Sequence, residues 1–262
     1  MIGALIGQGN TADIYDAGDK KVVKLFKQGD SLDHARQEFE NSRLLNGLDL
    51  PISKSYELVT YEERHGIIYD KIEGESLLDL VLRTGDVERY ATVLALFHKQ
   101  ILSCKLGGAA SLKSILKRNI ECTKDLTDLC KSQLYTALEE LPDGDRLCHG
   151  DFHFDNVLVH EGKNYMIDYM NVCRGHEYGD IARTVYLIEM TPVPSQMIDS
   201  ERILWMKKRA TDVYLLEMGV TRGDLADWLL VTAAARLSEL NHEQRDEKNS
   251  VLQYLSMRGV CE

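Results

Sequence analysis

The order of local patterns along the chain, strands first and helices afterwards, constrains the fold more than any other feature. Before residue 70, short runs of β-branched and aromatic residues are separated by turn residues, and Lys21–Phe26 is typical of a buried strand. Turns are expected at Gly18-Asp19 and at Glu62-Glu63-Arg64. The expected strands cover residues 4–9, 12–16, 21–26, 56–61 and 65–69.

One helix interrupts this strand-rich part. The apolar residues Ala35, Phe39 and Leu44 recur at roughly helical spacing, which predicts a helix over residues 32–46. The expected ends are Asp30 or Ser31 as the cap and Gly47 as the stop.

After Glu73-Gly74 the pattern becomes helical, with only two short strands expected, at 156–159 and 164–168. The sequence therefore predicts an α+β protein with two lobes. Residues 1–72 would form an antiparallel sheet with one helix, and residues 73–262 would form a larger, mainly helical lobe. The expected helices are 77–82, 87–103, 112–122, 126–141, 178–190, 196–218, 225–240 and 248–257.

Bulk properties limit the classes of function. No run approaches the ~20 apolar residues that span a bilayer, and the N-terminus lacks the basic start of a signal peptide. The six cysteines form no CxxC pair, so reduced thiols in a cytoplasmic protein are expected. The net charge of −11, without a basic block, argues against nucleic acid as a partner. It is compatible with a cationic small substrate, but an acidic surface that serves only solubility explains it better.

The residues most specific for chemistry are His149-Gly150-Asp151-Phe152-His153-Phe154-Asp155-Asn156, followed by Asp168. Catalytic loops of kinases have the form H-x-D-x-x-x-x-N with a metal-binding Asp further on. Asp151 can accept the proton of an attacking hydroxyl. Asn156 and Asp168 offer oxygen ligands that suit Mg²⁺, and His149 would brace the loop.

Upstream residues offer contacts for nucleotide phosphates. Gly7, Gly9, Asn10 and Thr11 lie between the first two expected strands. Alone, this G-x-G pattern is more typical of a plain β-turn between two strands, but its place favours a loop over phosphates.

Lys24, on the strand that follows, could reach the α- and β-phosphates if a helix carboxylate held it. Glu38 and Glu40 are both available, and counting back from Gly47 favours Glu38. Further along, the main chain of Asp70 and Ile72 could face a purine edge, although an ordinary linker has the same residue types.

Two other polar residues are expected to have structural roles. His98, on an apolar helix, has the setting of a satisfied core histidine. Asp180 is expected to cap or brace a helix and to pair locally, without a part in catalysis.

With these pieces in order, the chain resembles the aminoglycoside phosphotransferase and choline kinase superfamily, small-molecule kinases with the protein-kinase-like fold. The resemblance is carried by LCHGDFHFDNVLV (147–159), MIDYMN (166–171), GDIAR (179–183) and LDLPISKSYEL (48–58). It implies transfer from ATP or GTP, with Mg²⁺, to a hydroxyl of a small molecule, such as an aminoglycoside or a choline-like compound. It also implies Asp151 as catalytic base, Asn156 and Asp168 as metal ligands, and Lys24 with Glu38 as the phosphate-binding pair.

Departures from related patterns narrow this interpretation. Gly150 replaces the Arg of regulated protein kinases, and D-F-G and A-P-E are missing. Tyr169 replaces the Trp or Phe that usually follows the metal Asp of the superfamily.

Two alternatives stay open: an inactive kinase-like nucleotide-binding module, and a metal-dependent phosphohydrolase built on His149, His153 and the aspartates. The presence of Lys24, Asp151, Asn156 and Asp168 together speaks against the first, and the loop-like sequence around Gly150 against the second.

Overall fold

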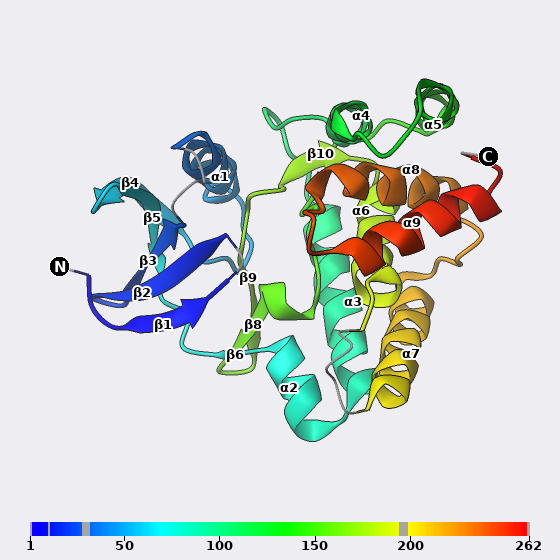
Figure 1. Cartoon of the computed structure of the whole chain (residues 1–262). Coiled ribbons are helices and arrows are strands. Elements are labelled where there is room, and N and C mark those ends of the chain that lie inside the picture. The colour runs from blue at the N-terminus through cyan, green and yellow to red at the C-terminus, as the bar shows by residue number, and fades with distance from the viewer. Residues whose placement is uncertain (1, 10, 28–31, 194–198, 261–262) are drawn as a thin grey trace. The chain divides into compact units, whose positions relative to one another are not determined.

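Residues Lys21–Phe26 lie in the middle of a five-stranded antiparallel sheet, as their apolar sequence predicts. The computed structural model describes residues 2–9, 11–27, 32–193 and 199–260, and Figure 1 labels most of its helices and strands. The strand order is β1-β2-β3-β5-β4. The bounds are β1 Leu5–Gln8, β2 Ala12–Gly18, β3 Lys21–Phe26, β4 Ser55–Tyr61 and β5 Arg64–Asp70.

Two-residue turns with positive φ join neighbouring strands of this sheet. They are formed by Asp19 and Lys20 between β2 and β3, and by Glu62 and Glu63 between β4 and β5. Such turns match the right-handed twist of a hairpin. The expectation that Arg64 belongs to the turn was wrong. It is the first residue of β5, and its guanidinium donates to the main-chain oxygens of Leu25 and Phe26.

Helix α1 (Leu32–Leu45) packs against β4 and β5. Its buried face includes Ala35, Glu38 and Leu45, in agreement with the helix expected over 32–46. Asn46, directly after the helix, donates to the main-chain oxygen of Ser55 at the start of β4 and so fixes the helix end to the sheet. The expected cap residues, Asp30 and Ser31, lie outside the described residues.

The chain divides into two compact units, and the first includes a segment from the middle of the sequence. It comprises the described residues of Met1–Leu82 together with Phe154–Val172. This middle segment holds a 3₁₀ turn, Phe154–Asn156, and the hairpin of β8 (Val157–His160) and β9 (Lys163–Met166). The strand β6 (Glu75–Ser76) pairs with β8. The sequence patterns did not predict so short a strand.

The second unit, built from Arg83–His153 and Cys173–Glu262, is mainly helical. Helices α3 and α7 pack side by side, and α8 packs against α4, α5 and α6 (Figure 1). A two-stranded sheet, β7 (Arg146–Cys148) with β10 (Cys173–Gly175), leads into the segment that carries Asp151. Helix α2 (Leu77–Thr84) begins in the first unit and ends in the second. The helices that follow are α3 Val87–Ser103, α4 Leu112–Cys122, α5 Asp128–Glu140, α6 Glu177–Val185, α7 Ser200–Met218, α8 Ala226–Arg236 and α9 Arg245–Met257.

Two of the expected helices change to another type of helix toward their C-terminal ends. The segment expected to be helical over 178–190 changes to a π-helix over Tyr186–Met190, and the C-terminal end of 225–240 is a 3₁₀ turn, Leu237–Glu239. Residues 196–198 of another expected helix lie outside the described part. Across the described ranges, no helix combines the length and apolar character needed to cross a membrane.

Candidate active site

Lys24 is the central cation of the first unit. Its side chain extends from β3, is 10% exposed, and places Nζ 2.8 Å from each carboxylate oxygen of Glu38. Nζ also lies 3.1 Å from Oδ1 of Asp168. The structure thus pairs Lys24 with Glu38 rather than Glu40, which is exposed.

The surroundings of Lys24 keep it charged. Burial alone would lower the pKa of Lys24, but the carboxylates of Glu38 and Asp168 outweigh burial and raise it. Glu38 is further fixed by the hydroxyl of Tyr69, which donates to it at 3.0 Å. The result is a rigid ammonium group whose neighbours are anionic.

Asp168 lies two residues beyond the end of β9. The expectation that it closes a strand was wrong, because β9 ends at Met166 and Asp168 has a φ of +66°. A non-glycine residue rarely adopts this conformation unless its surroundings impose it. Asn41 of α1 contributes to this, because its amide donates to the main-chain oxygens of Tyr169 and Met170 at 2.9 and 3.1 Å.

The hydroxyl of Tyr169 forms hydrogen bonds that the Trp or Phe usual at this position of the superfamily could not form in the same way. The ring is 1% exposed and lies edge-on to Tyr69. Its oxygen accepts from the N–H of Ser53 at 2.9 Å and donates toward the main-chain oxygens of Ser53 and Met166, at 3.0 and 2.7 Å. The Tyr169 hydroxyl therefore ties the residue that follows Asp168 to Ser53 and to the end of β9.

Asn156 ends the 3₁₀ turn before β8 and is 8% exposed. Its main-chain oxygen accepts from the N–H of Ile167 at 3.2 Å, so this hydrogen bond brings the backbones that carry Asn156 and Asp168 together. A carboxylate and an amide oxygen are the donors that a hard ion such as Mg²⁺ prefers. The residues present fit that ion.

Gly7 lies in β1 and pairs with Ile14 of β2, and the loop between the two strands contains Gly9 and Thr11; Asn10 lies outside the described residues. The N–H of Gly9 donates to the main-chain oxygen of Ala12 at 2.8 Å, and Lys27 Nζ donates to the oxygen of Gly9 at 2.6 Å. Thr11 and Gly9 are exposed. Neither Gly7 nor Gly9 has a positive φ.

The main chain of Asp70 is already engaged within the first unit. Its N–H donates to the oxygen of Lys54, and its oxygen accepts from the hydroxyl of Ser53 at 2.7 Å. Its carboxylate accepts from Lys21 at 2.5 Å. Ile72, two residues later, lies half-buried between β5 and β6 and is the stronger candidate for main-chain contact.

Asp151 belongs to the second unit. Its side chain is 25% exposed, with Oδ2 3.6 Å from Nε2 of His153 and Oδ1 3.7 Å from Nη2 of Arg183. Burial would raise the pKa of Asp151, but His153, Arg183 and His149 outweigh burial and hold it well below its usual range. Asp151 is therefore ionised throughout the neutral and mildly acidic range.

Asp180, at the start of α6, braces the loop before Asp151. Its carboxylate accepts the backbone N–H of His149 at 2.6 Å and of Gly150 at 2.8 Å. The expectation of local pairing was wrong, because these partners lie about thirty residues away in sequence. His98 is the buried, satisfied histidine that was expected, with Nε2 3.1 Å from Asp180 and Nδ1 2.6 Å from the hydroxyl of Tyr214.

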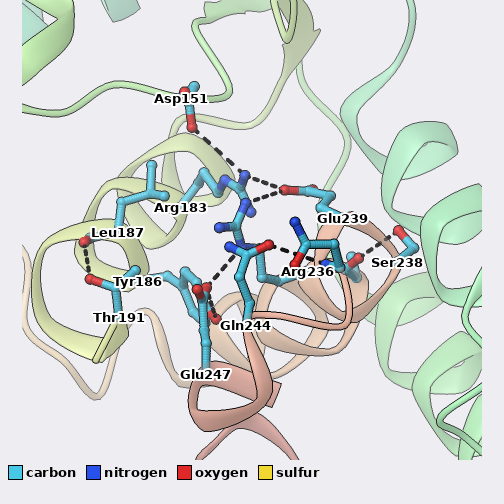
Figure 2. Close-up of polar contacts among 12 residues, drawn as sticks. Asp151, Arg183, Tyr186, Leu187, Thr191, Arg236, Ser238, Glu239, Gln244 and Glu247 are labelled. Atoms are coloured by element: carbon cyan, nitrogen blue, oxygen red, sulfur yellow. Dashed lines mark hydrogen bonds and ion pairs between the residues drawn. The ribbon is translucent and has the colours of Figure 1, made fainter. Parts of the chain in front are cut away.

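Arg183, one turn after Asp180, is a site residue that the sequence patterns did not single out. Its Nε donates to the main-chain oxygen of Gly150 at 3.2 Å. Its Nη2 donates to Glu239 at 2.6 Å, as Figure 2 shows. Two signals were available: its place in the segment GDIAR (179–183), which contributes to the resemblance, and its place three residues after Asp180, on the same helix face.

The histidines of the loop have roles other than a paired metal site. His149 is fully buried, and its Nδ1 accepts the N–H of Asp151 at 3.2 Å. Among the residues placed by the structure, no group of three or more His, Cys, Asp or Glu is arranged to hold a metal ion.

Comparisons with known proteins identify the family and the fold of the chain. A family model described as "Phosphotransferase enzyme family" matches residues 3–203. A search of curated proteins gives no match.

Solved structures share the fold at low identity. A thermostable mutant of aminoglycoside phosphotransferase APH(4)-Ia, in its apo form, has a TM-score of 0.67 and 15% identity, over 98% of this chain and 92% of that one. An aminoglycoside-3′-phosphotransferase of type VIII has a TM-score of 0.62 and 16% identity, over 90% and 93%. An amicoumacin kinase has a TM-score of 0.61 and 14% identity, over 95% and 87%.

Proposed function

Because the chain belongs to the phosphotransferase enzyme family, we propose that it transfers the γ-phosphoryl group of ATP or GTP to a hydroxyl of a small molecule, with Mg²⁺. The observation that carries the proposal is the placement of Lys24 between Glu38 and Asp168. A buried ammonium held by a helix carboxylate beside an Asp that can hold metal is the arrangement that phosphoryl transfer requires for its nucleotide.

The first unit would bind the nucleotide. Lys24 would contact the α- and β-phosphates, Gly7 at the end of β1 and the loop of Gly9 and Thr11 would cover them, and the main chain of Ile72 would face the base. Structural neighbours support a nucleotide, because they include complexes of an amicoumacin kinase with AMP-PNP and of APH(4)-Ia with ADP and hygromycin B.

Asn156 and Asp168 would hold the magnesium ion. When bound, Mg²⁺ neutralises phosphate charge. Asp168 is suited to this role because its backbone conformation is fixed by its surroundings and about a third of its side chain is exposed. Lys24, whose Nζ lies 3.1 Å from Asp168, would contact the same phosphates; as a cation it would not compete with Asp168 for the magnesium ion.

Asp151 would face the acceptor hydroxyl. Its pKa is held well below the usual range, so it is a weak base and always an acceptor of hydrogen bonds. Its main contribution is then to orient the hydroxyl oxygen toward the phosphorus and to take the proton late, as the new O–P bond forms.

The acceptor class is proposed from charge and from the neighbours. The net charge of −11 favours a cationic acceptor over an anionic one. Neighbouring structures include complexes with hygromycin B and with streptomycin. An aminoglycoside or another amine-bearing polyol, such as a choline-like compound, is therefore the class to test first.

A thermal-shift panel followed by turnover tests this function. ATP and GTP, each with and without Mg²⁺, then aminoglycosides, choline-like amines and sugars, should raise the unfolding temperature where they bind the folded state. Asp151→Asn should lower kcat by about 10²–10⁴-fold while nucleotide binding persists.

The matched control is Asp145→Asn, at an exposed carboxylate of the same unit that pairs with Lys105. It should leave kcat unchanged. Nucleotide binding without transfer to any acceptor would instead indicate an inactive binding module, and wild-type turnover in Asp151→Asn would refute the assigned role.

A further inference from the structure

We propose that Arg183 and Glu239 form a positioning pair that holds Asp151 ready for the acceptor hydroxyl, an inference that rests on the proposed function. Arg183 lies between two carboxylates, with Nη2 2.6 Å from Oε2 of Glu239 and 3.7 Å from Oδ1 of Asp151 (Figure 2). The side chain of Arg183 is 9% exposed, so its charge is largely shielded from water.

Arg183 contacts the catalytic loop at two points. Besides lying near the carboxylate of Asp151, it donates from Nε to the main-chain oxygen of Gly150 at 3.2 Å. Gly150 has a φ of +76°, a conformation that glycine adopts without strain. A planar guanidinium can hold both points at once, which an ammonium group cannot.

Glu239 is fixed from its other side by a second arginine. Arg236 donates from Nη1 to Glu239 at 2.8 Å and from Nε to Glu247 of α9 at 2.9 Å. Tyr186 donates to Glu247 at 2.9 Å. Charges of alternating sign thus extend from Asp151 to α9, as Figure 2 shows. Glu239 and Glu247 lie beyond residue 203, where the match to the family model ends.

The two distances indicate what Glu239 does. Arg183 is drawn to Glu239 and stays about one ångström farther from Asp151 than a direct hydrogen bond would place it. Without Glu239, the shielded guanidinium would move to within hydrogen-bonding distance of Asp151 and form a closer ion pair with it. That ion pair would occupy the carboxylate oxygen that the acceptor hydroxyl requires. Glu239 therefore acts on Asp151 through Arg183.

This role predicts a specific pattern of coupling. Glu239→Gln should lower kcat about tenfold, and Arg183→Met about a hundredfold, with KM for nucleotide and acceptor unchanged within about threefold. In the Arg183→Met background, Glu239→Gln should have no further effect on kcat, because the residue through which it acts is gone. Arg183→Lys, which keeps the charge but not the planar fork, should fall between wild type and Arg183→Met.

The matched control is Arg222→Met. Arg222 also joins two carboxylates, Glu189 and Asp212, at 2.7 and 2.8 Å, but on the surface of the same unit. It should leave kcat unchanged. Unfolding temperatures of all variants identify loss of fold; if Arg183→Met does not fold, Arg183→Lys with and without Glu239→Gln takes its place in the cycle.

Asp151→Asn, measured alongside, separates this inference from the proposed function. Wild-type turnover in Asp151→Asn would remove the proposed function and the inference together. Loss of turnover in Asp151→Asn, with wild-type kcat in Arg183→Met and Glu239→Gln, would overturn the positioning pair alone. Additive effects of Arg183→Met and Glu239→Gln on kcat would also overturn it.

Discussion

Replacing Asp180 by asparagine tests whether this buried carboxylate holds the loop that carries Asp151. The carboxylate accepts the backbone N–H groups of His149 and Gly150 at 2.6 and 2.8 Å, and Nε2 of His98 lies 3.1 Å from it. Asparagine keeps the shape of the side chain but replaces one oxygen by a donor. One of the two backbone N–H groups would then face another N–H group.

The magnitude follows from these contacts. A hydrogen bond to a charged group contributes about 1.5–3 kcal/mol, and a buried donor left without an acceptor costs about 1–3 kcal/mol. The side-chain volume does not change, so no cavity is added. Asp180→Asn should therefore lower the free energy of unfolding of the second unit by about 3–5 kcal/mol, a large part of the ~5–15 kcal/mol that stabilises a domain.

The ionisation of Asp180 gives this prediction a pH dependence. Burial would raise the pKa of Asp180, but hydrogen bonding and charge from His98, with His149 and the N–H of Gly150, hold it below its usual value. The stabilisation is complete above the unfolded-state pKa of about 4 and is lost as the pH falls through the lower pKa of the folded state. The gap between wild type and Asp180→Asn should be present at about pH 5 and should narrow below about pH 4.

Tryptophan fluorescence during urea unfolding measures this gap in the right unit, because Trp205 and Trp228 both lie in the second one. Asp212→Asn is the matched control. Its carboxylate is 38% exposed and pairs with Arg222, so the loss should stay under about 1 kcal/mol. An equally small loss for Asp180→Asn, or a gap that does not narrow in acid, would show that the carboxylate does not brace the loop.

Three further substitutions test the first unit. Lys24→Met should weaken nucleotide binding about 10–100-fold by calorimetry, because a charged contact to phosphate is lost; unchanged affinity would contradict its role. Tyr169→Phe should cost about 1–3 kcal/mol of unfolding free energy in denaturant titrations, because its partners at Ser53 lose a buried hydroxyl, whereas Tyr56→Phe, at an exposed ring, should cost less than about 1 kcal/mol. In wild type, chelation of Mg²⁺ should weaken nucleotide binding; in Asp168→Asn, binding should already be weak and chelation should not change it. Nucleotide binding by Asp168→Asn that still depends on Mg²⁺ would refute the role of Asp168.

The helices, the main strands and the pair of Lys24 with Glu38 could be predicted from the sequence because they depend on local patterns. Apolar spacing sets the helix face, and the register counted back from Gly47 placed Glu38 rather than Glu40 toward the sheet. The strands of two or three residues, β6, β7 and β10, were missed because so few residues carry no periodicity. The backbone of Asp168 was also missed, because its φ of +66° is imposed by its surroundings and not by its own type.

The residues that act on Asp151 could not be found from local sequence, because their partners are remote. Asp180 contacts residues about thirty positions earlier, and Arg183 contacts Glu239, 56 positions later. A buried Asp near a helix start has an equally good local explanation as a cap. Only the packing of α6 against the loop distinguishes the two.

Helix α6 holds the peptide groups next to Asp151 with two opposite charges. Asp180 accepts the N–H of Gly150, and Arg183, three residues later, donates to the oxygen of the same residue. A negative and a positive group on one helix face thus fix both polar atoms of a single glycine whose φ is +76°. Because these contacts lie within one unit, the direction of the Asp151 side chain is set before nucleotide or acceptor binds. Binding energy from either substrate is then available for orienting the hydroxyl rather than for ordering the catalytic loop.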